Sequence, residues 1–158
     1  MTVQTAKEII GCMEKINAHF RALETFINEK KAKVIADDLP WLLDSLVEEQ
    51  RLVAEGNHLE ANRMKLFERL GIADKKATVL IEECPEAYKE RLKLECVSIE
   101  RHIGLIKKTN ADIIEIIERK LTIQEKNSKM PVGSTSTYTG QGVKVRHPDT
   151  SGGFIGEV

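Results

Sequence analysis

Aromatic residues are scarce in this sequence, and long apolar runs are absent. Phe, Trp and Tyr make up only 4% of the 158 residues, so binding sites built from stacked rings are not expected. No segment reaches about 18 uncharged apolar residues, and the N-terminus lacks the apolar run of a signal peptide. The sequence therefore predicts a cytoplasmic protein that does not insert into a membrane.

An excess of charge of either sign is also missing. The chain has 24 basic and 25 acidic residues, which gives a net charge of −1. Proteins that bind DNA or RNA usually show a basic surface, because they must neutralise phosphates. Nucleic acid is therefore not expected as a partner.

The sequence holds little of the chemistry that enzymes use. Its three cysteines are widely spaced and odd in number, and Cys96 falls on an apolar helical stripe, which favours reduced thiols. The four histidines have no zinc-site spacing and are expected to be solvated or partly buried. His102 is the one candidate for a phosphotransfer histidine, but no Lys-Gly pair follows it. We expect no catalytic residue, no metal and no cofactor.

Helical spacing of apolar residues begins close to the N-terminus. Thr5 and Glu8 are placed as a capping box, which predicts a helix start there. From Ile9 to Val34 the apolar residues recur in steps of three and four, a pattern typical of a coiled-coil-like seam. A first helix is predicted over about 5–35.

A second helix is predicted over about 40–70. Pro40 suits the first turn of a helix, and Gly71 suits the left-handed position that follows a helix C-terminus. The middle of this helix should be weak, since Gly56 costs about 1 kcal/mol relative to Ala. Residues 73–83 are compatible with a short extra helix or with an ordered connection.

The longest predicted helix covers about 86–127. Its seam runs from Leu92 through Asn110 to Leu121, and about 40 helical residues span about 60 Å. Whether the helix bends at Asn110 stays open. Three long amphipathic helices with short joints predict an all-α fold, an elongated antiparallel bundle over residues 1–127.

The composition changes after Ser128. Residues 128–158 contain six of the ten glycines and two of the four prolines. This segment has too little apolar surface to offset the entropy of ordering, so a flexible Gly/Ser/Thr-rich tail is predicted.

The end of the third helix carries more apolar surface than one face requires. At 100° per residue its apolar side chains cover an arc of about 180°, whereas a stripe that faces a core needs about 100°. The candidate binding residues are Leu105, Ile113, Ile114, Ile116, Ile117, Leu121 and Ile123.

Two interpretations of this surplus remain open. The extra face either packs against the first helix or a second copy of the chain, with Asn110 fixing the register, or it receives an amphipathic helix from a partner. A homodimer is therefore one possible assembly.

Three stretches together resemble the flagellar export chaperones that serve the hook-filament junction proteins. The stretch "LLDSLVEEQRLV" at 42–53 is similar to a Leu-rich helix of that family, and "NRMKLFERLGI" at 62–72 is similar to the end of that helix. In the tail, "STYTGQG" at 136–142 resembles the family's tyrosine followed by glycine.

The resemblance implies a cytoplasmic, non-enzymatic protein with two partners. It implies binding of the terminal helices of the junction proteins, which prevents premature assembly, and delivery of these clients to the flagellar export gate. It also implies that Tyr138 contacts a component of the gate. The alternative is a structural homo-oligomeric coiled-coil protein without a client.

Overall fold

The computed structural model describes residues 1–129, and helices are the only regular secondary structure in these residues. Helical bounds are Val3–Ile35 for α1, Leu39–Asp44 for α2, Leu46–Arg69 for α3, Ala77–Glu82 for α4 and Glu86–Ser128 for α5. The all-α prediction is confirmed. The predicted tail lies outside the described residues, apart from its first two positions.

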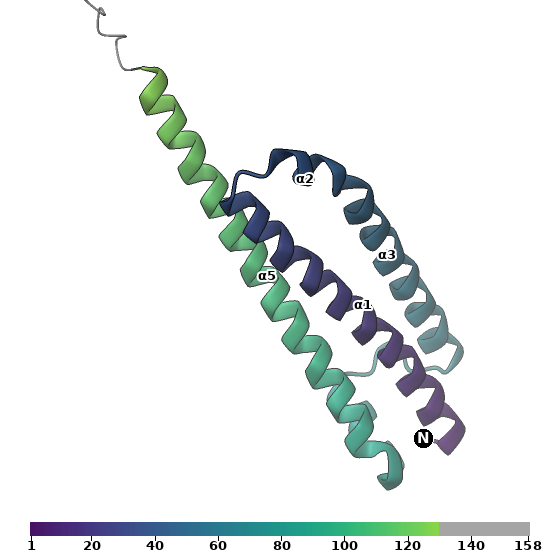
Figure 1. The fold of residues 1–158 in the computed structure, drawn as a ribbon. Helices are drawn as coiled ribbons and strands as arrows, with labels where there is room; N and C mark the ends of the chain where they lie inside the picture. The colour runs from purple at the N-terminus through teal and green to yellow at the C-terminus, as the bar shows by residue number, and fades with distance from the viewer. Residues whose placement is uncertain (130–158) are drawn as a thin grey trace, which may run out of the picture.

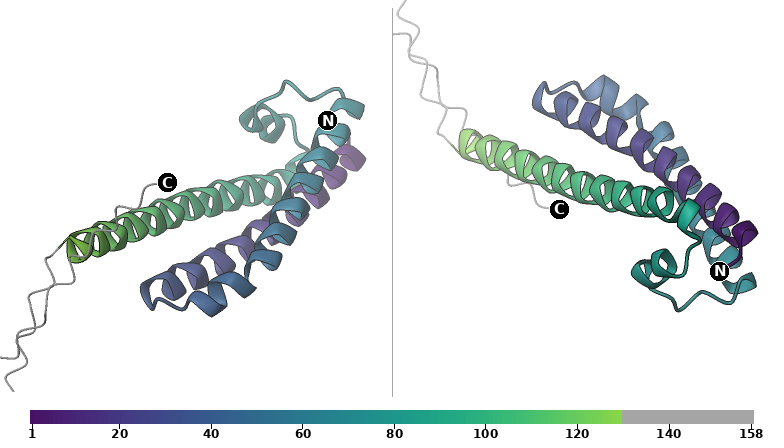
Figure 2. Two further views of the ribbon diagram at one scale, coloured as in Figure 1. Left: turned by 90° about the horizontal axis from the view of Figure 1, so that it is seen from above. Right: turned by 90° about the horizontal axis from the view of Figure 1, so that it is seen from below.

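Helix α1 lies between the other two long helices (Figure 1). α3 runs antiparallel to α1, with Glu49 bonded to Lys30 and Arg69 bonded to Glu8. α5 runs parallel to α1 and packs along most of its length, whereas α3 and α5 make no close backbone approach to each other. The two views of Figure 2 show the same elongated arrangement, in which α5 extends beyond α1 and α3.

The first helix starts earlier than the sequence predicted. The hydroxyl of Thr2 accepts a hydrogen bond from the Thr5 backbone N–H over 3.1 Å and caps α1. Thr5 therefore lies inside the first turn, and Glu8 pairs with Gln4 and Arg69 instead of closing a capping box. The predicted cap was wrong because two threonines with the same capping chemistry stand three residues apart.

The predicted helix over 40–70 is divided at Ser45. The Ser45 hydroxyl donates to the carbonyl of Leu42 over 3.0 Å, a local bond that bends helices, and α2 and α3 meet there. Asp38 caps α2 by accepting from the Trp41 N–H, and Pro40 lies in its first turn as predicted. The bend turns the chain back along α1.

The remaining joints agree with the glycine and proline signals. Gly71 takes a φ of 65° directly after the end of α3, where a residue with a side chain would be strained. Residues 77–82 form the short helix α4, so the segment 73–83, for which a short helix or an ordered connection was predicted, is partly helical. α5 begins after Pro85 and continues through Asn110 without a break.

Two clusters of buried residues hold the bundle together, one at each end. The cluster near the N-terminus joins α1, α3, α4 and α5, and its largest members include Ile9, Phe67, Leu80 and Leu92. The second cluster joins α1, α3 and α5 through Phe26, Val34, Leu52, Ile106 and Ile113. Trp41 and Leu42 of α2 pack against the second cluster.

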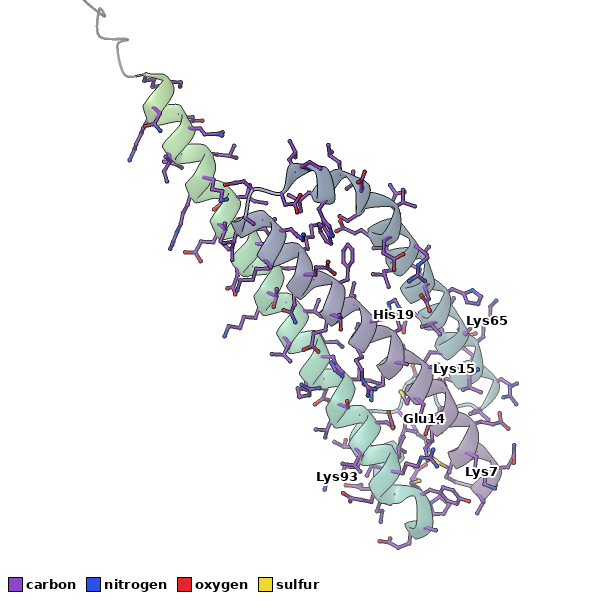
Figure 3. The ribbon with its side chains drawn as sticks, in the orientation of Figure 1. Lys7, Glu14, Lys15, His19, Lys65 and Lys93 are labelled. Atoms are coloured by element: carbon purple, nitrogen blue, oxygen red, sulfur yellow. The ribbon has the colours of Figure 1, made fainter. Side chains whose placement is uncertain are left out.

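Gly56 lies where α3 passes closest to a ring of α1. A Cβ atom at this position would stand 2.9 Å from Nε2 of His19, which is closer than real Cβ contacts. His19 is buried between α1 and α3, as Figure 3 shows. Gly56, which was predicted to weaken this helix, therefore leaves room for the His19 ring. Helix α3 stays continuous through Gly56.

Two glycine substitutions test this interpretation. At Gly104 a Cβ would meet nothing within 4 Å, so Gly104→Ala should raise the free energy of unfolding by about 1 kcal/mol through helix propensity. Gly56→Ala should lower the free energy of unfolding, because a displaced buried ring costs about 1–3 kcal/mol. Urea denaturation of both variants measures this difference. Equal increases in the free energy of unfolding would show that the His19 ring does not need the space at Gly56.

Candidate functional site

Helix α5 extends past the end of α1 (Figure 1). Lys120 is the residue of α5 that bonds to the last turn of α1. The Lys120 ammonium group donates to the carbonyls of Val34 and Ile35 over 2.8 and 3.1 Å and also to the Asp37 carboxylate. It satisfies carbonyls that the end of α1 leaves without an intrahelical partner. From Leu121 to Lys129 every residue is exposed.

The structure does not bring the seven predicted binding residues onto one face. Ile113 is only 5% exposed and belongs to the second buried cluster, so it completes the bundle. Ile116 is half-buried and packs against the same cluster. The other five have exposed side chains: Leu105, Ile114, Ile117, Leu121 and Ile123.

The exposed residues separate into two stripes on α5. At 100° per residue, Ile114, Ile117 and Leu121 fall within an arc of about 60°. Leu105 and Ile123 lie about 150° away from the centre of that arc, on the flank that Ile116 shares. The line that faces α1 runs between the two stripes, through Glu95, His102, Ile106 and Ile113.

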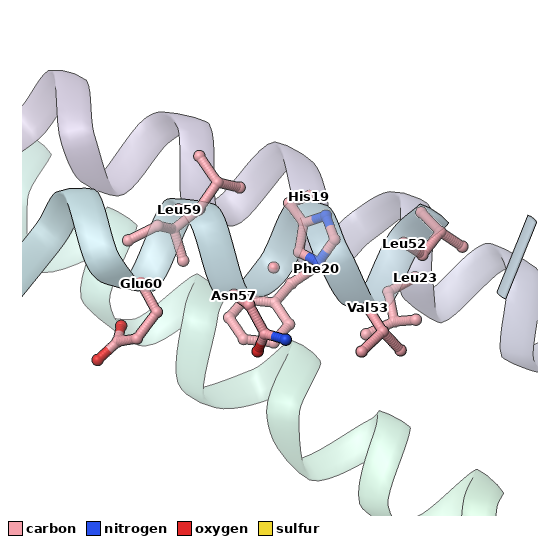
Figure 4. A pocket seen from close by; sticks show the side chains of 10 residues that line it. His19, Phe20, Leu23, Leu52, Val53, Asn57, Leu59 and Glu60 are labelled. Atoms are coloured by element: carbon pink, nitrogen blue, oxygen red, sulfur yellow. The ribbon is translucent and has the colours of Figure 1, made fainter. Parts of the chain in front are cut away.

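An apolar hollow lies between α1 and α3 (Figure 4). It has a volume of about 270 Å³, and its floor includes Ile16, Phe20 and Leu23 of α1. Val53 and Leu59 of α3 form its wall. The sequence did not predict this hollow, because its walls depend on how far α3 stands from α5.

A second hollow of about 280 Å³ adjoins the first on the α5 side. It shares Ile16, Phe20 and Glu60 with the first hollow, and α5 contributes Cys96, Ile99 and Ile103 to its wall. The carboxylate of Glu60 is held by Arg63 over 2.6 Å, which keeps the Glu60 pKa below its usual value. The two hollows together form one apolar depression, floored by α1 and bounded by α3 and α5.

Two histidines are more deeply buried than the sequence predicted. His102 lies against α1, where its Nδ1 contacts the carboxylate of Glu24, and the ring is unavailable for phosphotransfer in this arrangement. His19 lines the first hollow, and its Nδ1 is a buried nitrogen for which residues 1–129 provide no hydrogen-bond partner. The nearest carboxylate oxygen, on Glu55, is 3.8 Å away.

The cysteine thiols lie on different sides of the bundle. Cys96 lines the second hollow, Cys12 lines a separate depression on the other side of α1, and Cys84 is buried in the first cluster. Burial raises the pKa of both the Cys12 and the Cys96 thiol. In the part of the chain that the structure describes, no group of three or more His, Cys, Asp or Glu residues is arranged to hold a metal ion.

The fold and its surface define an all-α bundle whose longest helix presents apolar side chains to solvent. Among the helices of residues 1–129, none has the length and apolar character needed to cross a membrane. These properties define an elongated helical bundle with an exposed apolar surface.

The family model described as FlgN protein matches residues 1–145, so the chain belongs to the FlgN family. These proteins are flagellar export chaperones for hook-associated proteins, and the family is one of chaperones and not of enzymes. The predicted resemblance is confirmed. No curated protein and no solved structure matches the chain.

Proposed function

We propose that this FlgN-family chain is a cytoplasmic chaperone that binds the terminal helical segments of the hook-filament junction proteins, which are hook-associated proteins. By covering these segments it prevents premature assembly, and it then delivers the client to the flagellar export gate. Membership of the family supports the general role.

One observation carries the proposed client binding. Ile114, Ile117 and Leu121 form an exposed apolar stripe on the part of α5 that α1 and α3 leave uncovered. Exposed apolar stripes at helical spacing are the surfaces on which amphipathic helices dock. A client segment that forms its own helical contacts only after assembly would have its apolar side chains covered here.

The energetics favour reversible binding. Each Å² of buried apolar surface contributes about 25 cal/mol, but part of this gain is lost in ordering the client segment. A chaperone that hands its client to another protein must release it, so very tight binding would be a disadvantage. We expect saturable binding with fast dissociation.

The experiment is a direct binding titration. The full chain is titrated calorimetrically with C-terminal segments of the hook-associated proteins of the same organism. Saturable binding that disappears when the segment's apolar helix face is made polar is expected. Absence of binding to every hook-associated protein would overturn the proposed client class.

Delivery to the gate rests on Tyr138, which lies outside the described residues. We expect Tyr138→Ala to keep the client affinity of the wild type and to lose binding to the purified export-gate component. Tyr138→Phe is the matched control, because it keeps the aromatic ring and removes only the hydroxyl. Loss of client binding in Tyr138→Ala would instead place the tail in the client site.

A further inference from the structure

We propose that the client occupies a trough on one side of the bundle and lies there as an additional helix, between α3 and α5 and on top of α1. This inference rests on the proposed function and gives it a location. The trough is defined by a floor on α1 of Ile16, Phe20 and Leu23, a wall on α3 and a wall on α5.

The α5 wall lies on the same face of the helix as the exposed stripe beyond it, and Asn110 stands between them. Cys96, Ile99 and Ile103 line the second hollow, and at 100° per residue they occupy the same arc of about 60° as the exposed stripe. The side chains that complete this line are Ile114, Ile117 and Leu121. The track along α5 is therefore apolar at both ends, from Cys96 to Ile103 and from Ile114 to Leu121, with the polar Asn110 between the two parts.

The α3 wall presents apolar surface to the same space. Val53 lines the first hollow and is 56% exposed, although a valine of a three-helix core would be covered. At 100° per residue Leu46 lies on the same side of α3 as Val53, and it is also exposed. Because α3 and α5 do not approach each other, no described helix covers this wall.

The length of the trough fits a helical segment. From Ile99 to Leu121 the α5 track measures about 33 Å at 1.5 Å per residue, which matches a helix of about 22 residues.

The rim charges define the chemistry of the occupant. Glu100 lines the second hollow, and Lys107 follows seven residues later on the same side of α5, so both flank the apolar track. Glu60 on the opposite rim is already paired with Arg63. Flanking charges of this kind select partners in coiled coils, so the occupant is an amphipathic helix with a basic residue opposite Glu100.

A second copy of the chain fits the trough less well. The exposed stripe that a copy can insert, from Ile114 to Leu121, spans about 10 Å, which is less than a third of the track. The family relation instead supplies hook-associated proteins as clients. The occupant is therefore assigned to a hook-associated protein.

Two matched valines test the location. Val53→Glu places a charge on the trough wall, whereas Val97→Glu changes a residue of similar exposure, 54%, on the outer side of α5. We expect Val53→Glu to weaken client binding at least tenfold and Val97→Glu to leave it unchanged. Circular dichroism and thermal melting of both full-length variants confirm that they remain folded.

The native thiols supply a second measurement that needs no substitution. Client binding should slow alkylation of Cys96, which lines the trough, and leave the rate at Cys12 on the other side unchanged. Both rates are measured by mass spectrometry at alkaline pH, because burial raises both thiol pKa values.

The outcomes separate the location from the function. Suppose that the wild type binds a client. If Val53→Glu then binds it equally well, or if Cys96 stays unprotected, the proposed location of the client is overturned and the chaperone function stands. If Cys96 becomes protected by raising the concentration of the chain alone, the occupant is a second copy and the assignment is overturned. If the wild type binds no hook-associated protein, the function and the trough fail together.

Discussion

Ile117→Asp should weaken binding of the client segment by about 10-fold to 150-fold. Ile117 is 41% exposed in the free chain, so its apolar surface is available to a partner. Binding buries only this remaining surface, but a carboxylate placed there must also be desolvated, and together these effects cost about 1.4–3 kcal/mol. Each 1.4 kcal/mol changes a dissociation constant tenfold. Isothermal titration of the full-length variant with the C-terminal segment of a hook-associated protein measures the loss.

Ile117 is a cleaner site for this experiment than its neighbour Ile116. Ile116 packs against the buried cluster that contains Val34 and Ile113, so Ile116→Asp would weaken both the fold and any binding. Val97→Asp is the matched control for Ile117→Asp, since it places the same charge on the outer side of α5. Normal client affinity in a folded Ile117→Asp variant would mean that the client does not cover the end of α5.

Leu92→Ala should lower the free energy of unfolding by about 2–5 kcal/mol. Leu92 is 1% exposed and packs in the cluster that joins α1, α3, α4 and α5. Its truncation removes buried apolar surface and leaves a cavity, which together cost this amount in well-packed cores. Because small domains are stable by only about 5–15 kcal/mol, the variant loses a large share of its stability.

Leu94, two residues further along α5, provides the control for this stability effect. Leu94 is 58% exposed, so Leu94→Ala removes little buried surface and should change the free energy of unfolding by no more than about 0.5 kcal/mol. Urea denaturation followed by circular dichroism measures both variants. Similar small losses at both positions would show that the packing of α5 in this cluster contributes little stability.

Local signals in the sequence predicted the helices well. Spacings of three and four, Pro40 and Gly71 placed the long helices within a few residues of their positions, because helix ends depend on nearby side chains. Ser45 divided the second helix through a bond to a carbonyl three residues back, which the apolar pattern does not encode. The flexible tail and the division of the chain at residue 128 stay predictions.

The candidate site was less accessible to the same reasoning. The surplus of apolar residues near Ile117 could be recognised on one helix, but its division between core and surface depends on where α1 lies. Ile113 faces α1 and Ile114 does not, although they are adjacent in sequence. The hollow beneath Val53 depends on the separation of α3 from α5, a tertiary property that no single helix pattern contains.

The bond from Lys120 to the end of α1 has a consequence for the order of α5 itself. Beyond it only eight helical residues remain, from Leu121 to Ser128, and all are exposed. This end continues a helix that is already formed, but it packs against no other described element, so we expect it to fray more readily than the packed part of α5. Amide hydrogen exchange should therefore rise steeply past Lys120, and a bound client should suppress it. Part of the free energy of client binding is then spent on ordering these last two turns.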